Sequence, residues 1–291
     1  HGRDRRQRQM CIRDSSKTKE VFSKLVLSKY DVKYYSCKSC HFLQTENPFW
    51  LTEAYKNGAI GALDVGIMER NKNLVKSTSA ILDKLFPIEH KIKGIDYGGG
   101  HGIFVRSMRD IGYDFFRSDL YAENLYAKFF DLQDLEVGTN FDILCAFEVF
   151  EHLPDPLTEI KKMLSLSDII LFSTEIQPNS ELDILKDWWY LVPEGGQHCS
   201  LYHLQSLKKI AEVLNLHFYS NKSNLHMLTA KKLKFDPFEI NIERTSWIKG
   251  MFNRTLNILF SKNKNIIPKS RKSLIQQDFV YVKQKIITNE H

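Results

Sequence analysis

The sequence predicts an α/β protein whose sheet is parallel and carries helices on both of its faces. Three observations support this prediction. Short apolar strands alternate with amphipathic helices between residues 94 and 216, and such alternation is typical of parallel sheets. A glycine-rich turn at 98–102 joins the first of these strands to the first helix. Apolar residues make up 43% of the 291 residues, so the chain can bury a sizeable core.

The expected elements begin upstream of this region. Two short strands at 21–27 and 31–37 flank a turn, and residues Leu51–Lys56 form the start of a helix. Apolar residues at helical spacing predict a longer helix within 60–85, and the segment 86–90 ends it. The remaining expected elements are a strand running into the glycine turn at 94–102, a helix at 103–113, strands at 114–121 and 141–147, a helix at 157–164, a strand at 168–176, a helix at 201–216, and a closing hairpin at 217–221 and 225–232.

The chain divides into four segments of different character. Residues 1–15 have neither an apolar period nor a strand pattern, so we expect an artefact of the sequence or a disordered basic arm. Residues 16–59 form a small N-terminal module with its linker, and residues 60–230 form the main domain. A helical C-terminal extension follows at 231–291, with one amphipathic helix expected over Trp247–Phe260 and a final apolar run.

The net charge of +6 does not predict a nucleic-acid binder. Residues 1–14 carry five Arg against two Asp, and residues 261–285 carry six Lys and one Arg against one Asp. The rest of the chain is therefore slightly acidic, and no basic face is expected on the folded part. We interpret the basic segment Lys262–Lys272 as a solvated face, with contact to an anionic membrane surface as the alternative.

The glycine turn itself narrows the class of ligand. Glycines stand at 98, 99, 100 and 102, directly after a strand and at the start of a helix. There the backbone can turn sharply, and the amides of the helix start can face a ligand. A dinucleotide fingerprint, G-x-G-x-x-G, needs its third glycine where this chain has Ile103.

Two acidic residues accompany the turn. Asp96 lies two residues before Gly98, and Asp119 lies 21 residues after it at the end of the next strand. An acidic residue at that second position suits the ribose hydroxyls of an adenosine cofactor and would repel a 2′-phosphate, which argues against NADP.

These residues resemble class I methyltransferases that depend on S-adenosylmethionine (SAM). The run GIDYGGGHGIFVRSMRDIGYDFFRSDLY at 94–121 is similar to their first two motifs, and FDILCAFEVFEHLPDP at 141–156 is similar to the motif at their fourth strand. Residues 188–216 resemble the substrate-side loop and late helix of a branch that often accompanies surface-polysaccharide and nucleotide-sugar pathways. Residues 30–55 resemble the zinc-knuckle module that precedes its catalytic domain. The resemblance covers about residues 17–228 and implies a Rossmann-like methyltransferase sheet.

The resemblance also implies a cofactor site at the carboxyl ends of the strands. Asp119 would bind the ribose, and Asp96 would support the loop or the methionine ammonium. Tyr55 would reach the SAM carboxylate, or else make an ordinary helix contact. The other implied residues are Gly98, Gly100 and Gly102 around the methionine part, Asp131 and Leu132 near the adenine, and Phe147 and Glu148 beside the transferring methyl group. For Asp131 the alternative is a carboxylate in a surface loop.

Three residues are candidates for acting on the methyl acceptor. His198, in a glycine-bearing loop after the fifth strand, is the first choice for a base, because imidazole titrates near neutral pH; the alternative is a residue that only positions substrate. Glu151 and His152 follow the fourth strand, where they would bind substrate or transfer a proton at the rim of the pocket. The alternative is that Glu151 is a favourable acid at a helix start and that His152 only packs. His101, inside the glycine turn, is expected to contribute its backbone. Trp188–Tyr190 would stack on a sugar, cover the site or fill the core.

The pair Cys37 and Cys40 is half of a zinc site. A structural zinc ion needs four ligands, and upstream only Cys11 is present, with Asp14 where a second cysteine would complete the pair. His41 is a possible substitute ligand. We therefore expect an incomplete zinc site, or simply two cysteines in a strand turn.

Methyl transfer to a small polar acceptor, such as a sugar or nucleotide sugar, is the leading hypothesis. The alternatives are an NAD-linked sugar oxidoreductase or epimerase and a non-catalytic binding protein of the same fold. An odd count of five cysteines predicts a reducing, cytoplasmic environment rather than a disulfide framework. No apolar run is long enough to span a membrane.

Overall fold

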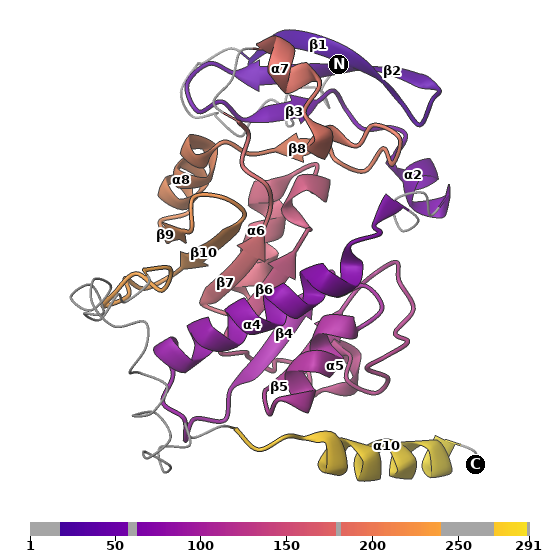
Figure 1. Ribbon diagram of the computed structural model, residues 1–291, viewed down its shortest axis with the longest axis vertical. Helices are drawn as coiled ribbons and strands as arrows, with labels where there is room; N and C mark the ends of the chain where they lie inside the picture. Colours follow the sequence, from indigo (N-terminus) through magenta and orange to yellow (C-terminus); the bar gives the residue numbers. More distant parts are fainter. Residues whose placement is uncertain (1–17, 58–62, 179–181, 240–270, 290–291) are drawn as a thin grey trace, which may run out of the picture.

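The computed structural model describes residues 18–57, 63–178, 182–239 and 271–289. In this part of the chain the strands form one sheet of six strands and one of four. The smaller sheet lies beyond the carboxyl ends of the parallel strands of the larger one (Figure 1). This placement matters for function, because ligands of open α/β sheets bind at that edge.

The six-stranded sheet is parallel on one side and antiparallel on the other. Its order is β5-β4-β6-β7-β10-β9, with β5, β4, β6 and β7 parallel and with β10 antiparallel to both of its neighbours. The closing hairpin predicted from the sequence is therefore confirmed. The strands are β4 (Lys93–Tyr97), β5 (Asp114–Ser118), β6 (Ile143–Phe147), β7 (Ile169–Ser173), β9 (His217–Ser220) and β10 (Leu225–Thr229).

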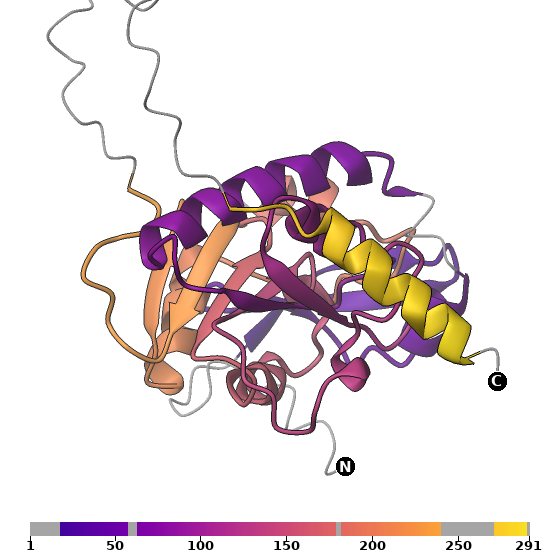
Figure 2. The same ribbon diagram turned by 90° about the horizontal axis from the view of Figure 1, so that it is seen from below.

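Helices cover this sheet on both faces, as expected. The long helix α4 crosses one face, and α6 lies on the opposite one (Figures 1 and 2). Asp155 caps α6 by accepting a hydrogen bond from the backbone amide of Thr158, and Pro156 occupies the first turn. The helices of this domain are α4 (Ile67–Leu85), α5 (Ile103–Asp110), α6 (Pro156–Leu164) and α8 (Leu204–Val213), with short 3-10 turns η1 (Leu132–Asp134) and η2 (Phe150–His152).

The centre of the sheet is apolar because both of its faces are covered. Strand β6 reads ILCAF, and its first four residues are fully buried. Such an unbroken apolar strand is typical of a parallel sheet between two helical layers. Phe150 and Phe172 extend this core toward the carboxyl edge, where their rings stack at a centroid distance of 3.8 Å.

The four-stranded sheet combines segments that are far apart in the sequence. Its order is β1-β2-β3-β8, and every pair is antiparallel. The strands are β1 (Thr18–Val26), β2 (Tyr30–Cys37), β3 (Leu43–Thr45) and β8 (Ser200–Leu201). A short helix α2 (Leu51–Asn57) follows the first three strands and leads toward the main domain. The N-terminal module is therefore completed by a strand that the main domain supplies.

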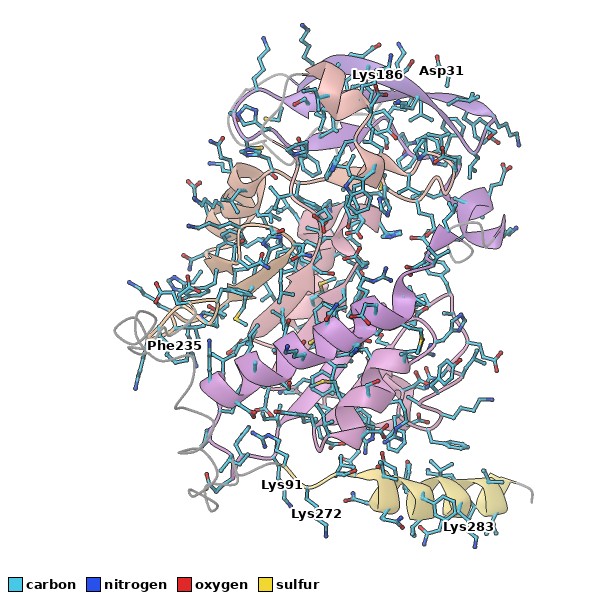
Figure 3. The ribbon with its side chains drawn as sticks, viewed as in Figure 1. Asp31, Lys91, Lys186, Phe235, Lys272 and Lys283 are labelled. Atoms are coloured by element: carbon cyan, nitrogen blue, oxygen red, sulfur yellow. The ribbon has the colours of Figure 1, made fainter. Side chains whose placement is uncertain are left out.

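A segment of the main domain also packs against the N-terminal strands. Helix α7 (Leu182–Lys186) and the turn η3 (Trp189–Leu191) share an apolar core with β1 and β2. Lys186 of α7 and Asp31 of β2 lie at the same end of the molecule (Figure 3). Trp50, buried in this core, donates a hydrogen bond from Nε1 to the carbonyl of Gly196 at 2.8 Å. The loop that carries His198 is therefore fixed by the N-terminal module.

The final apolar run forms helix α10 (Ile275–Asn289), which lies along the β5 edge of the main sheet (Figure 2). Asp278 attaches it, because its carboxylate pairs with both Arg106 and Arg109 of α5. Lys283 lies on the outer side of this helix (Figure 3).

The helix expected over 201–216 begins at Leu204 as α8, because residues 200–201 join the small sheet and the side chain of His203 caps the helix. The amphipathic helix expected over Trp247–Phe260 lies outside the described residues.

Candidate active site

The glycine turn after β4 adopts the conformation for which its glycines are needed. Gly98, Gly100 and Gly102 all have positive φ, at 71°, 53° and 86°. A Cβ atom at Gly98 would lie 2.6 Å from Val149, whereas a Cβ atom at Gly100 would meet no atom within 4 Å. The backbone at Gly100 therefore borders open space, as a turn that holds a ligand requires.

Asp119 ties this turn to the loop that follows β5. Its Oδ2 accepts a hydrogen bond from the amide of Gly100 at 2.9 Å, and its Oδ1 accepts from the amides of Tyr121 and Ala122 at 2.8 and 2.7 Å. The structure thus brings Asp119 beside the glycine turn, at the carboxyl edge of the sheet. Its contact with a ribose stays a prediction.

Asp96 lies beneath the turn and is buried. Burial, and then the charge of Asp119, raise the pKa of Asp96 to about 8, while Arg117 acts in the opposite direction. Sequence reasoning missed Arg117. Its guanidinium donates hydrogen bonds to the carbonyls of Gly100 and Ala122, so it joins the same two loops from below. A lone arginine inside the apolar strand DFFRS was the signal that could have identified it.

The structure excludes one of the two sequence expectations for Asp131. Its side chain is almost completely buried, so it is not a surface carboxylate. Oδ1 accepts from Nε of Arg117 at 2.6 Å, and Oδ2 accepts from Nδ2 of Asn124 at 2.8 Å. Both oxygens therefore serve the protein interior, because Arg117, buried in β5, needs a counter-charge. The structure gives the Asp131 carboxylate a structural role, and contacts of Asp131 and Leu132 with the adenine stay predictions.

Glu148 occupies a strained position at the end of β6. Its φ is 53°, an unusual value for a residue with a side chain. Ser173 of β7 holds it on two sides, because its hydroxyl accepts from the Glu148 amide at 2.9 Å and donates to Oε1 at 2.6 Å. Phe147 packs edge-on against Phe104. Strain of this kind occurs at functional sites when the surrounding structure enforces it.

The three candidate catalytic residues come together as one cluster, in which Glu151 and His198 are buried and His152 is partly buried. One ligand-type atom from each of Glu151, His152 and His198 lies within 4.8 Å of the others. Nε2 of His152 is 3.9 Å from Oε1 of Glu151, and the two imidazole rings meet edge to face at a centroid distance of 4.9 Å. Local sequence explains Glu151 and His152, which share the turn η2. His198 arrives from 46 positions downstream because β8, just after it, pairs with β3.

Tyr190, from the aromatic run before the loop, connects the cluster to Glu148. Its hydroxyl lies 2.7 Å from Oε1 of Glu151 and 3.3 Å from Oε2 of Glu148. Its backbone carbonyl lies 2.6 Å from Nδ1 of His198. A carbonyl can only accept, so Nδ1 of His198 carries the proton and its Nε2 keeps a lone pair. Trp189 is largely exposed, and Trp188 packs on the core of the small sheet.

Burial sets the protonation of the cluster. It lowers the pKa of His198 to about 4 and the pKa of His152 well below its ordinary range. Burial, and then the charge of Glu148, raise the pKa of Glu151 above its ordinary value. Both imidazoles are therefore neutral near pH 7, and the carboxyl of Glu151 resists ionisation.

Tyr55 lies between the cluster and the loop after β5. Its ring stacks on Tyr121 at a centroid distance of 4.2 Å, and it lies 6.5 Å from the ring of His152. The N-terminal module thus contributes a side chain to this region. A contact with the SAM carboxylate stays a prediction. His101 holds the carbonyl of Glu123 through its ring and is exposed, which fits a residue of the loop rather than of the cluster.

The cysteine pair lies apart from this cluster. Cys37 ends β2, and its sulfur is 3.3 Å from the hydroxyl of Ser39. Cys40 is disulfide-bonded in this structure, and a sulfur in a disulfide is not a thiolate ligand. The ring of His41 meets that of His203, from the main domain, at 5.0 Å. Zinc binding therefore stays a prediction for the reduced chain, and Cys11 and Asp14 lie outside the described residues.

The family of the chain follows from comparison with known proteins. A family model described as a methyltransferase domain matches residues 70–220, which is just over half of the chain. The chain therefore belongs to the methyltransferase domain family, and it is a SAM-dependent methyltransferase rather than an NAD-linked enzyme. A search of curated proteins found no relative of this chain.

Several solved structures are similar to this chain. The magnesium protoporphyrin IX methyltransferase of Synechocystis PCC 6803 with bound S-adenosylhomocysteine is 14% identical, with 61% of this chain and 97% of that one covered and a TM-score of 0.40. A plantazolicin methyltransferase in complex with a monoazolic desmethylPZN analogue and S-adenosylhomocysteine is 11% identical, with 62% of this chain and 93% of that one covered and a TM-score of 0.42. A Haloferax volcanii putative methyltransferase, in complex with the Trm112 methyltransferase activator, is 13% identical. The match covers 61% of this chain and 98% of that one, with a TM-score of 0.42.

The residues of the site fit SAM. The space above Gly100 is open, the neighbouring amides are held by Asp119, and Glu148 and the buried cluster lie on the adjacent strand end. In the part of the chain that the structure describes, no helix is both long enough and apolar enough to cross a membrane.

Proposed function

We propose that this protein transfers the methyl group of SAM to a hydroxyl of a small polar acceptor. We expect the acceptor to be a sugar or nucleotide sugar, because residues 188–216 resemble a branch associated with such pathways. The observation that carries the proposal is the buried cluster of Glu151, His152 and His198 beside the end of β6. A hydroxyl, unlike an amine, must lose a proton to become a good nucleophile, and this cluster offers acceptors for that proton.

The residues of the chain divide the work of this reaction. Bound SAM supplies a methyl group on a sulfonium centre, so the protein has to position the reactants and exclude water. The turn at Gly98–Gly102 and the carboxylate of Asp119 hold the cofactor. Glu148 and Phe147 border the place where the acceptor approaches. His198 offers the lone pair of Nε2 to the acceptor proton, while the Tyr190 carbonyl fixes its ring.

The N-terminal module is part of this active site. Tyr55 extends from α2 toward Tyr121 and His152, and Trp50 fixes the loop before His198 through Gly196. We infer that the module shapes the acceptor pocket, and that the reduced cysteine pair with His41 contributes a structural zinc site when it is completed. We also infer a cytoplasmic location from the odd count of cysteines and the buried free thiols of Cys145 and Cys199; the disulfide at Cys40 is an observation that opposes it.

The proposal is tested by a screen with SAM labelled in its methyl group. The full chain is incubated with sugars, nucleotide sugars, small amines and carbon acids, and label in the product is counted. We expect label on hydroxyl-bearing sugars or nucleotide sugars. Label on amines alone would contradict the hydroxyl assignment, and label on non-sugar hydroxyls alone would contradict the acceptor class.

A further inference from the structure

We propose that Glu151, His152 and His198 form a binding site for a divalent transition-metal ion. Two imidazoles and one carboxylate are a frequent ligand set for such ions, which leave further coordination positions open to water or substrate. The metal-binding part of this proposal stands on the geometry alone. Its consequence for methyl transfer rests on the proposed function.

The ligand atoms already converge. All three lie within 4.8 Å of one another, with 3.9 Å between Nε2 of His152 and Oε1 of Glu151. Ligands about 2.1 Å from one ion lie roughly 3.0–3.4 Å apart. Binding would therefore draw the side chains together by about 1 Å, which requires side-chain rotation without a change of fold.

The two histidines present the form that metals bind. Metal-ligating histidines are neutral, and their other ring nitrogen is usually fixed by a hydrogen bond. Nδ1 of His198 donates to the Tyr190 carbonyl at 2.6 Å, which leaves Nε2 for an ion. The side chain of Gln197 lies near the ring of His152 and opposes the effect of burial on its pKa. The ring of His198 is therefore oriented for an ion by a hydrogen bond at its other nitrogen.

The carboxylate is harder to explain without a cation. Glu151 is fully buried. Among the described residues, no lysine or arginine forms a salt bridge with it, and its ion-pair contact is with Nε2 of His152 at 3.9 Å. Oε1 accepts from the Tyr190 hydroxyl. Oε2 makes no hydrogen bond of normal geometry, although the hydroxyl of Thr174 is near enough to contribute to lowering the pKa of the carboxyl. Burying an incompletely bonded carboxyl is costly. A divalent ion would offset this cost by stabilising the charged form.

The mixture of ligands indicates which ions suit the site. Imidazole nitrogen favours zinc, copper, iron or nickel, whereas the carboxylate also suits manganese; calcium and magnesium prefer oxygen ligands throughout. The site also differs from the cysteine pair of the N-terminal module, because thiolates would select softer ions there.

An ion at this place would act on the acceptor. By withdrawing electrons, a bound ion would lower the pKa of a hydroxyl that it contacts. With the ion in place, Nε2 of His198 is a ligand and not the base, so in the transfer the acceptor O–H bond breaks and its proton passes to water. The oxygen lone pair forms the new bond to the methyl carbon, and the electron pair of the methyl–sulfur bond remains on sulfur, which leaves S-adenosylhomocysteine. An acceptor with two neighbouring oxygen atoms, as in sugars, would fill coordination positions that the three side chains leave open.

Metal titration of the full chain tests the site directly. The protein is treated with EDTA, dialysed, and titrated with Mn²⁺ followed by electron paramagnetic resonance; Co²⁺ absorption supplies the geometry. Mn²⁺ is suitable because it prefers carboxylate and imidazole to thiolate. We expect one saturable site in the wild type. Affinity should fall by at least about 100-fold in Glu151→Gln and in His198→Ala, since even outer partners of ligands contribute 10–100-fold.

The controls separate this proposal from simple structural damage. His217→Ala removes an exposed histidine on β9 and should bind Mn²⁺ as the wild type does. Circular dichroism checks that each variant is folded. Equal binding by the wild type, Glu151→Gln and His198→Ala, or no saturable binding at all, would overturn the proposal.

Activity and SAM binding then distinguish the two proposals. If the EDTA-treated protein binds SAM and methylates its acceptor at full rate, the ion has no role and the proposed function stands. If it binds Mn²⁺ at this site but transfers no methyl group to any hydroxyl, the metal site stands and the proposed function fails. Recovery of methyl transfer by Mn²⁺ after EDTA treatment supports both.

Discussion

Asp278→Asn should lower the free energy of unfolding by about 3 kcal/mol, because it leaves a buried guanidinium without its main counter-charge. Arg109 is 3% exposed, and it donates to both oxygens of Asp278 at 2.8 Å from Nε and Nη2. Arg106 adds a third bond to Oδ2 at 2.7 Å. Asp114 also pairs with Arg109 but is partly exposed, so it compensates incompletely. Urea unfolding of the full chain measures the change.

The matched control is Asp110→Asn. Asp110 pairs with the same Arg106 but lies at the surface, where such a pair contributes between about 0 and 1 kcal/mol. If the two variants unfolded at the same urea concentration, α10 would not be attached in the way described here.

The same carboxylate makes the attachment of α10 sensitive to acid. Burial acts to raise the pKa of Asp278, but the hydrogen bonds from Arg109 and Arg106 outweigh it, and the net pKa lies below its ordinary value of 3.8. A carboxyl whose pKa is lower in the folded state stabilises that state above its ordinary pKa. This contribution disappears as the pH falls through the folded-state pKa. Asp278→Asn should therefore lose most of its disadvantage in strong acid.

His198→Ala should reduce turnover by about 10²–10⁴-fold while SAM binding is retained. The imidazole is the one member of the cluster that the loop before β8 contributes, and its ring is fixed by the Tyr190 carbonyl. Removing it deletes either the proton acceptor or a ligand of the proposed ion. Initial rates with labelled SAM, and calorimetry with SAM alone, make the two measurements.

His217→Ala is again the appropriate control, since it removes an exposed imidazole from β9. Turnover by His198→Ala at the wild-type rate would remove this residue from the mechanism under both interpretations.

Local patterns in the sequence were sufficient for most of the fold. The strand at β6 and the helix at α4 follow from unbroken apolar runs and helical spacing, which depend on neighbouring residues only. Strand β8 could not be predicted, because two residues form a strand only when a distant partner, here β3, is already in place. The start of α8 was misplaced for the same reason.

The site was predictable residue by residue but not as an arrangement. The turn chemistry pointed to Gly98–Gly102 and Asp119, and the structure places them together. The role of Asp131 depended on Arg117, whose side chain turns inward from β5 to meet it. The approach of His198 to Glu151 depends on the pairing of β8 and on Trp50 fixing the loop. Such long-range packing leaves no periodic signal in the sequence.

Titration calorimetry of the full chain with SAM and with NAD tests the central claim most directly. We expect one SAM to bind in the micromolar range, NAD not to bind, and SAM binding to be lost in Asp119→Ala, because that carboxylate holds the amide of Gly100 and is the predicted ribose contact. Glu123→Ala, an exposed change in the same loop, should bind SAM normally. Binding of NAD without SAM would contradict the account of this protein as a SAM-dependent methyltransferase.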